Sequence, residues 1–126
     1  MILVDSNIFL EVLLKQEKFE VCKRFLQENE QYVVISDFTI YTIGIKLLFH
    51  GLTEEYEAFV GDAENRWTTE RLPFNDYSTL LEFNKHKKLD FDDAYQASIA
   101  FLNRYDICTL DADFNSVKDQ VKVIAP

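Results

Sequence analysis

Short apolar runs alternate along the chain with longer segments in which apolar residues recur at helical spacing. Ile2–Val4 and Tyr32–Ile35 are continuous apolar runs that end at polar residues. This pattern is typical of short strands buried on both faces of a sheet. Further strands are predicted at Trp67–Leu72, Asp106–Thr109 and Val121–Ile124.

Helices are predicted in the intervals between these strands. In the segment 19–26, apolar residues recur at the spacing of one helical face. The other predicted helices cover 8–14, 38–48, 53 to about 61, 76 to about 85, and 91–105, with Thr53 as an N-cap and Gly51 ending the helix before it. The resulting order, β-α-α-β-α-α-β-α-α-β-β, predicts a parallel sheet with helices on both faces.

Composition limits the class of protein. The chain has 126 residues, 48% of them hydrophobic, which favours one folded domain spanning residues 1–126. Its 13 basic and 22 acidic residues give a net charge of −9. A domain that binds nucleic acid by neutralising phosphates carries the opposite balance. If this chain handles nucleic acid, another positive charge must act at the point of contact.

Several common sites and locations are also disfavoured. The three glycines, Gly44, Gly51 and Gly61, are too widely spaced to form either the GxGxxG or the GxxxxGK[ST] phosphate-binding loop. Cys22 and Cys108 lie far apart in the sequence, so we expect two reduced thiols in the core. The opening has no basic segment before its apolar run, and no run approaches the ~18 apolar residues of a membrane span. We therefore expect a cytoplasmic protein without a membrane partner.

Acidic residues gather at the predicted carboxyl edge of the sheet, where open parallel sheets bind their ligands. They follow strands or begin a helix: Asp5, Asp37, Asp92, Asp93, Asp111 and Asp113. Two carboxylates at ~4 Å repel by about 4 kcal/mol at an effective dielectric of ~20. Either their pKa values rise or a cation offsets the repulsion, and acids without a basic partner nearby in the sequence favour a divalent ion. Oxygen-only ligands favour Mg²⁺ or Mn²⁺, which promote phosphodiester hydrolysis. The alternative is that the acids cap helices or form turns.

Three motifs carry a resemblance to PIN domains. Val4-Asp5-Ser6-Asn7-Ile8-Phe9 resembles the opening VDTNVLL motif of that family. Leu89-Asp90-Phe91-Asp92-Asp93-Ala94 resembles its L-x-x-x-DA motif, and Thr109-Leu110-Asp111-Ala112-Asp113-Phe114 its T-x-D-x-DF motif. The order, the spacing and the chain length all agree, and the match looks like the small VapC-type toxins.

The resemblance implies a three-layer α/β/α sandwich with a central parallel sheet and a Mg²⁺- or Mn²⁺-dependent ribonuclease site. By this resemblance, Asp5, Asp93 and Asp111 are the catalytic and metal-binding acids, with Asp113 as a further metal ligand. The residues that would orient these carboxylates are Asn7, Ser36 and Thr109. Many such proteins are homodimers that pair with a small antitoxin.

One position departs from the family pattern. The family usually has a glutamate in the helix after the second strand, about six residues beyond the serine. Counting from Ser36 leads to Thr42, and the segment 38–51 contains no acid. Asp37 is the candidate replacement as a metal ligand. Without a replacement the site keeps three principal carboxylates, and weakened or lost catalysis becomes plausible.

Two surface features bear on partners. The run Lys85-His86-Lys87-Lys88 either contacts RNA phosphates through Lys85, Lys87 and Lys88 or is a solvated helix end. The helix 38–49 is apolar nearly all round, which indicates burial on more than one side or a surface for a dimer or an antitoxin.

The main functional prediction is a metal-dependent endoribonuclease, the toxin of a toxin–antitoxin pair. The alternative is a degenerate PIN domain that binds RNA or a protein without cutting. A phosphoacceptor receiver domain is disfavoured, because such domains usually have paired acids after the first strand and Asp5 stands alone.

Overall fold

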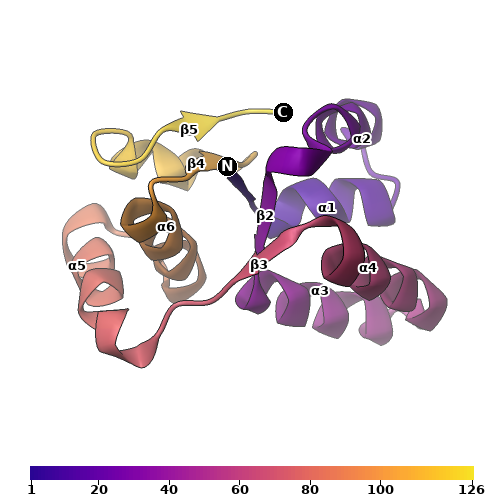
Figure 1. The fold of residues 1–126 in the computed structure, drawn as a ribbon, viewed down its shortest axis with the longest axis horizontal. Coiled ribbons are helices and arrows are strands. Elements are labelled where there is room, and N and C mark those ends of the chain that lie inside the picture. The colour runs from indigo at the N-terminus through magenta and orange to yellow at the C-terminus, as the bar shows by residue number, and fades with distance from the viewer.

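The centre of the molecule is a five-stranded sheet. The computed structural model describes residues 1–126, and its strands lie in the order β3-β2-β1-β4-β5, all parallel to their neighbours (Figure 1). The strands are β1 (Ile2–Val4), β2 (Val33–Ser36), β3 (Thr68–Glu70), β4 (Asp106–Cys108) and β5 (Val123–Ile124). The parallel sheet predicted from the apolar runs is confirmed.

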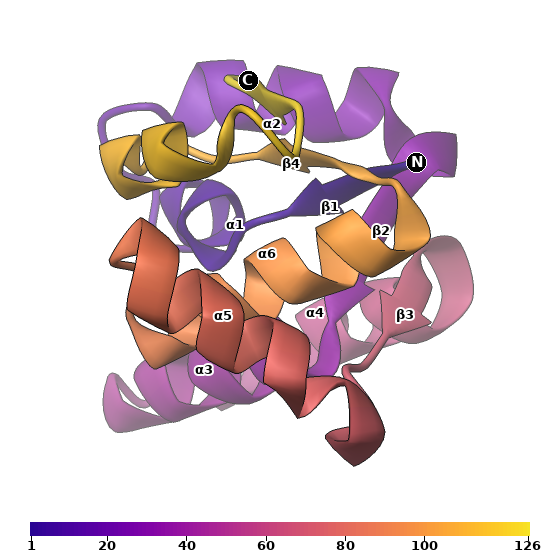
Figure 2. The same cartoon turned by 90° about the vertical axis from the view of Figure 1, so that its left-hand side faces the viewer.

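Helices cover both faces of this sheet and complete a three-layer α/β/α sandwich. They are α1 (Ser6–Leu13), α2 (Phe19–Glu28), α3 (Asp37–Phe49), α4 (Thr53–Arg66), α5 (Tyr77–Lys87) and α6 (Phe91–Asn103). Short 3₁₀ turns occupy Glu30–Tyr32, Phe74–Asp76 and Ala112–Val117. In Figure 1, α5 and α6 lie on one side of the strands and α1 to α4 on the other; Figure 2 looks onto the side covered by α5 and α6.

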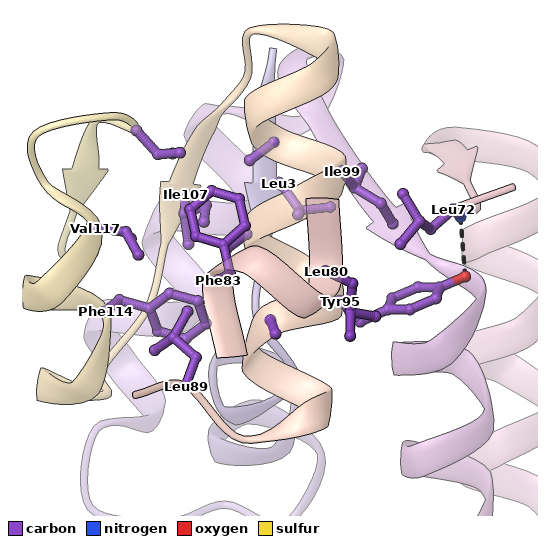
Figure 3. Packing of buried hydrophobic residues seen from close by; sticks show 14 of the residues in the cluster. Leu3, Leu72, Leu80, Phe83, Leu89, Tyr95, Ile99, Ile107, Phe114 and Val117 are labelled. Atoms are coloured by element: carbon purple, nitrogen blue, oxygen red, sulfur yellow. Dashed lines mark hydrogen bonds between the residues drawn. The ribbon is translucent and has the colours of Figure 1, made fainter. Parts of the chain in front are cut away.

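The two faces of the sheet carry separate hydrophobic clusters. Leu3 and Val34 point to the α5–α6 side, whereas Val4 and Ile35 belong to the cluster beneath the other helices. This alternation is the two-residue period of a strand. Figure 3 shows the first cluster, where side chains of α5 and α6 meet Leu3 and Ile107. Full burial of each such aliphatic side chain contributes about 1.5–3 kcal/mol.

Strand register brings the loops that follow β1 and β4 together. Val4 is opposite Cys108, and the Asp5 backbone N–H donates to the Cys108 carbonyl at 3.0 Å. Asp5 and Thr109 therefore leave the sheet side by side. The parallel register fixes this edge as the place where residues about a hundred positions apart in the sequence meet.

Some predicted helix limits are wrong. The helix expected to end near Gly61 continues to Arg66. A helix interior tolerates a glycine, and the turn that follows Gly61 packs against the core through the buried Ala63. It begins at Thr53 itself, after Leu52, so Thr53 is not its N-cap. The prediction for Gly51 is confirmed, since it follows α3 with a φ of +71°.

Helix α3 is buried on one side only. Ile43 and Leu47 face the core, whereas Tyr41, Ile45, Leu48 and Phe49 are exposed. Cys22 and Cys108 are free and buried, as predicted. None of the helices combines the length and the apolar character that crossing a bilayer requires.

Candidate metal centre

Three carboxylates from two segments converge at the carboxyl edge of the sheet. Asp93 lies in the first turn of α6, Asp111 follows β4, and Asp113 lies in the 3₁₀ turn after it. One carboxylate oxygen from each residue lies within 4.8 Å of the others. Asp93 and Asp111 are half-buried and Asp113 is exposed, so the group is open to solvent on one side.

Asp5 lies deeper, at the N-terminus of α1, and is 7% exposed. Its Oδ1 accepts from the Ser6 backbone N–H at 2.8 Å, so Asp5 also caps the helix. Its Oδ2 accepts from the Thr109 hydroxyl at 2.8 Å and from Asn7 Nδ2 at 3.1 Å. One oxygen of this carboxylate therefore caps α1, and the other is held by Asn7 and Thr109 at the edge of the sheet.

Asn7 and Thr109 connect Asp5 to the loop that carries Asp111. Asn7 Oδ1 accepts from the Leu110 N–H at 3.3 Å, and Thr109 Oγ1 accepts from the Asp111 N–H at 2.9 Å. Asp111 Oδ1 in turn accepts from the Asp113 N–H at 2.9 Å. This chain of hydrogen bonds holds the carboxylates in place even though they repel one another.

The electrostatics match a site for a cation. Burial, followed by the charges of Asp92, Asp5, Asp111 and Asp113, raises the pKa of Asp93 to about 7. Burial also raises the pKa of Asp5, against hydrogen bonds from Thr109, Ser6 and Gln96 that lower it. No ion pair of the protein includes any of these acids. Because no basic side chain balances this group, its oxygen donors fit a hard divalent ion.

Asp37 lies outside this group. It is the first residue of α3, and its Oδ1 accepts from the Tyr95 hydroxyl at 2.8 Å. Tyr95 Oη also accepts from the Leu72 N–H at 2.9 Å, which ties α3, α6 and the loop after β3 together (Figure 3 draws the bond to Leu72). Asp37 is absent from the charges that raise the pKa of Asp93. The expectation that Asp37 joins the metal-site acids is therefore corrected: a phenol from α6 holds its carboxylate.

Ser36 has a structural role in the first turn of α3. Its Oγ accepts from the Thr39 N–H at 3.0 Å, and the two hydroxyls are 3.1 Å apart. Ser36 does not contact the acidic group, so its expected part in orienting those carboxylates is not seen. Thr42, at the place of the family glutamate, donates to the Phe38 carbonyl at 2.9 Å.

Gln96 is a site residue that the sequence analysis missed. It is 3% exposed, its Nε2 donates to Thr39 Oγ1 at 2.8 Å, and its Oε1 is buried without a partner. Its amide is close enough to lower the pKa of Asp5. The signal was its position three residues after Asp93, which places both side chains on one face of α6.

The basic run divides into two kinds of lysine. Lys87 Nζ donates to both Asp119 oxygens, at 3.1 and 2.9 Å, so its charge is already paired. Lys85 and Lys88 are exposed and form no ion pair. His86 lies 3.2 Å from Glu82 on the same helix.

Comparison with known proteins agrees with this geometry. The family model described as PIN domain matches residues 2–120. A search of curated protein sequences gives no match.

Solved structures share the fold at low sequence identity. A toxin-antitoxin complex from Klebsiella pneumoniae is 17% identical, with a TM-score of 0.79 and coverage of 98% of this chain and 96% of that chain. The Mycobacterium tuberculosis toxin VapC20, described as cleaving the sarcin-ricin loop, is 15% identical, with a TM-score of 0.80 and coverage of 93% and 95%. VapBC2 from Rickettsia felis, bound to a promoter DNA fragment, is 15% identical, with a TM-score of 0.77 and coverage of 99% and 98%.

Proposed function

Since the chain belongs to the PIN domain family, we propose that it is a metal-dependent endoribonuclease and the toxin of a toxin–antitoxin pair. The observation that carries the proposal is the group formed by Asp93, Asp111 and Asp113, with Asp5 behind it and no basic side chain to balance it. Such a group is costly to keep ionised unless a cation occupies it. A cation bound at this place would also attract the RNA phosphate, which the acidic chain itself repels.

Asp93, Asp111 and Asp113 would hold Mg²⁺ or Mn²⁺, and Asp5 would add negative charge from beneath. When bound, the ion supplies an activated water and neutralises the charge of the scissile phosphate. The protein's own contribution is to keep the oxygens in place. Asn7 and Thr109 hold Asp5 and the Asp111 loop, and the half-buried position of Asp93 limits the water around it.

The proposed partners are RNA, a small antitoxin and a second copy of this chain. The antitoxin is supported by similarity to proteins solved as toxin-antitoxin complexes. The homodimer is supported by the exposed apolar residues of α3, which are Tyr41, Ile45, Leu48 and Phe49. Monomers rarely leave such a contiguous apolar patch uncovered.

A second candidate function rests on the missing glutamate. Thr42 is neutral, and Asp37 is held by Tyr95. A site with one acid fewer binds a cation more weakly, so a PIN domain that holds RNA or a protein without cutting is the alternative.

Cleavage of structured RNA by the purified, antitoxin-free protein tests the proposal. We expect cleavage with Mg²⁺ or Mn²⁺, none with EDTA, and a loss of at least about a hundredfold in Asp93→Asn. Asp92→Asn is the matched control, because it removes a neighbouring exposed acid that is not one of the three converging carboxylates. Absence of cleavage of several RNAs by a folded protein with either metal would favour the non-catalytic alternative.

A further inference from the structure

Most of the buried polar side chains of the protein belong to one connected group. Apart from Tyr95 and the two cysteines, the buried polar residues are Asp5, Ser36, Thr39, Gln96, Ser98 and Thr109. The Ser98 hydroxyl donates to the Ala94 carbonyl of its own helix at 2.7 Å. The other five connect the first turn of α3, through α6, with the start of α1 and the loop after β4. Buried polarity is thus concentrated beside the acidic group of Asp93, Asp111 and Asp113.

Gln96 is the member of this group that comes from α6. Its Nε2 carries two N–H donors. One of them is donated to Thr39 Oγ1 at 2.8 Å. The amide also hydrogen-bonds to the Asp5 carboxylate and lowers the pKa of that residue, against the effect of burial. Gln96 therefore connects the carboxylate beneath the acidic group to the first turn of α3.

The carbonyl end of the same amide has no partner. Gln96 is 3% exposed, and its Oε1 is buried without a hydrogen-bond donor. A buried acceptor that is left unpaired is destabilising, and an apolar side chain of the same length would avoid this cost. Packing gives no reason for an amide at this position, whereas the N–H donors toward Thr39 and Asp5 do.

The same contact fixes α6 relative to the acidic group. Gln96 lies three residues after Asp93, on the same face of the helix. The preceding residue, Tyr95, donates to Asp37 at 2.8 Å. Two successive side chains of α6 are thus bonded to the first turn of α3, through Asp37 and Thr39. These bonds restrict rotation of α6 about its axis, and that rotation determines where Asp93 points.

We propose that Gln96 is a positioning residue for the metal centre: its amide, anchored on Thr39, holds the Asp5 carboxylate in place and thereby raises the affinity of the acidic group for a divalent ion. A carboxylate that is fixed and ionised attracts the ion more strongly than one that is mobile or protonated. Gln96 acts through Asp5 and is too buried to touch the ion itself. The inference rests on the proposed function in one respect, which is that the acidic group holds a divalent ion.

The test is Mn²⁺ binding to the full chain, measured by isothermal titration calorimetry without RNA. Gln96→Met keeps an unbranched side chain and removes the amide. It should raise the Kd for Mn²⁺ by about ten- to a hundredfold. The thermal midpoint of the metal-free protein should stay the same or rise, because the unpaired acceptor is gone. A side chain with only a structural role would give the opposite result, a lower midpoint and an unchanged Kd.

Ser98→Ala is the matched control. It removes a buried hydroxyl from the same helix, one that is bonded only within α6. The Kd of this variant for Mn²⁺ should equal that of the parent. Equal weakening by Ser98→Ala and Gln96→Met would mean a general loosening of α6 and would overturn the proposal. An unchanged Kd in a folded Gln96→Met protein would also overturn it.

Thr39→Val tests the anchor of the amide. This change removes the hydroxyl to which Gln96 donates and should raise the Kd for Mn²⁺ by less than Gln96→Met does. In a protein that already carries Gln96→Met, it should add no further loss, because Thr39 acts on Asp5 only through the amide. Additive losses would contradict a connection that runs from Thr39 through Gln96 to Asp5.

A measurement on the unaltered protein covers the case in which Gln96→Met does not fold. The side-chain amide signals of Gln96 in ¹⁵N–¹H NMR spectra should shift as Mg²⁺ is added and should follow the same binding curve as calorimetry with Mg²⁺. The Asn65 amide is the control, since it is exposed and donates to the Gly61 carbonyl within α4. Gln96 signals that stay unshifted at saturating Mg²⁺ would overturn the proposal.

RNA cleavage is measured separately, so the two proposals fail independently. Weaker Mn²⁺ binding by Gln96→Met, combined with no cleavage by the parent, overturns the nuclease and supports the positioning role. Cleavage by the parent, combined with normal Mn²⁺ binding by Gln96→Met, supports the nuclease and overturns the positioning role. Absence of Mn²⁺ binding by the parent overturns the positioning role whatever the cleavage result.

Discussion

At the scale of single residues, Asp93 contributes to how stability depends on pH. Burial and the neighbouring carboxylates raise the pKa of Asp93 in the folded protein to about 7 from its ordinary value of about 3.9. Between these two pH values the folded protein therefore binds a proton that the unfolded chain has lost. Ionisation of Asp93 therefore lowers the free energy of unfolding. This loss is absent below about pH 4, grows as pH rises, and is complete above about pH 7. Stability of the metal-free protein should fall as pH rises through this window.

Urea unfolding in EDTA at pH 5 and pH 8 measures this contribution. After allowance for solvent screening of a half-exposed carboxylate, we expect Asp93→Asn to be more stable than the parent by about 1–2 kcal/mol at pH 8 and by roughly a third of that difference at pH 5. Millimolar Mg²⁺ should stabilise the parent at pH 8 and not the variant. Equal stability of the two proteins at both pH values would contradict the assigned burial and charge repulsion.

The partner of Asp37 leads to a second prediction at this scale. Because its carboxylate accepts from Tyr95 rather than joining the converging acids, Asp37→Asn should keep metal-dependent cleavage within about threefold of the parent. The amide oxygen still accepts from the phenol, so the fold should be retained. A loss as large as that of Asp93→Asn in the same assay would return Asp37 to the metal site.

At the scale of elements, two glycines in helices should respond in opposite directions. A Cβ at Gly44 of α3 would lie 2.7 Å from the Tyr56 ring, and the Tyr56 hydroxyl donates to the Ile40 carbonyl at 2.8 Å. The close packing of α3 on α4 requires that glycine. A Cβ at Gly61 in α4 meets nothing within 4 Å.

We therefore expect Gly44→Ala to lower the unfolding free energy by about 1–3 kcal/mol through overpacking. Gly61→Ala should raise it by about 0.5–1 kcal/mol, because alanine favours a helix interior. Thermal and urea unfolding of the pair measure both changes. Stabilisation by Gly44→Ala would mean that the two helices pack less closely than described.

At the scale of the whole molecule, charge determines how RNA approaches. The net charge of −9 repels a polyanion. We therefore expect the attraction of RNA to depend strongly on local positive charge, such as that of the unpaired lysines Lys85 and Lys88. Replacing both by glutamate should weaken RNA binding and reduce its salt dependence. Lys87→Glu should have a smaller effect on binding, because Lys87 is paired with Asp119. If the double variant bound RNA with unchanged affinity at low salt, Lys85 and Lys88 would not contribute to attracting RNA.

Features that depend on neighbours in the sequence were predictable. The element order, the parallel sheet and the place of Asp5, Asp93, Asp111 and Asp113 at its carboxyl edge follow from apolar periodicity and from acids directly after strands. A strand period or a helix start is set within a few residues. Helix limits were less accurate. Whether a helix ends at a glycine such as Gly61 or continues past it depends on how the residues after the glycine pack.

Contacts between distant residues were decided by the tertiary structure. Asp37 meets Tyr95 across 58 positions, Gln96 meets Thr39 across 57, and Asn7 meets Thr109 across 102. Strand order and helix packing determine which side chains share a space, and a one-dimensional pattern does not contain this information. The sequence alone thus determined that carboxylates would gather at one edge. Only the folded chain decided that Asp37 is held apart from them, and that Gln96 lies beside Asp5.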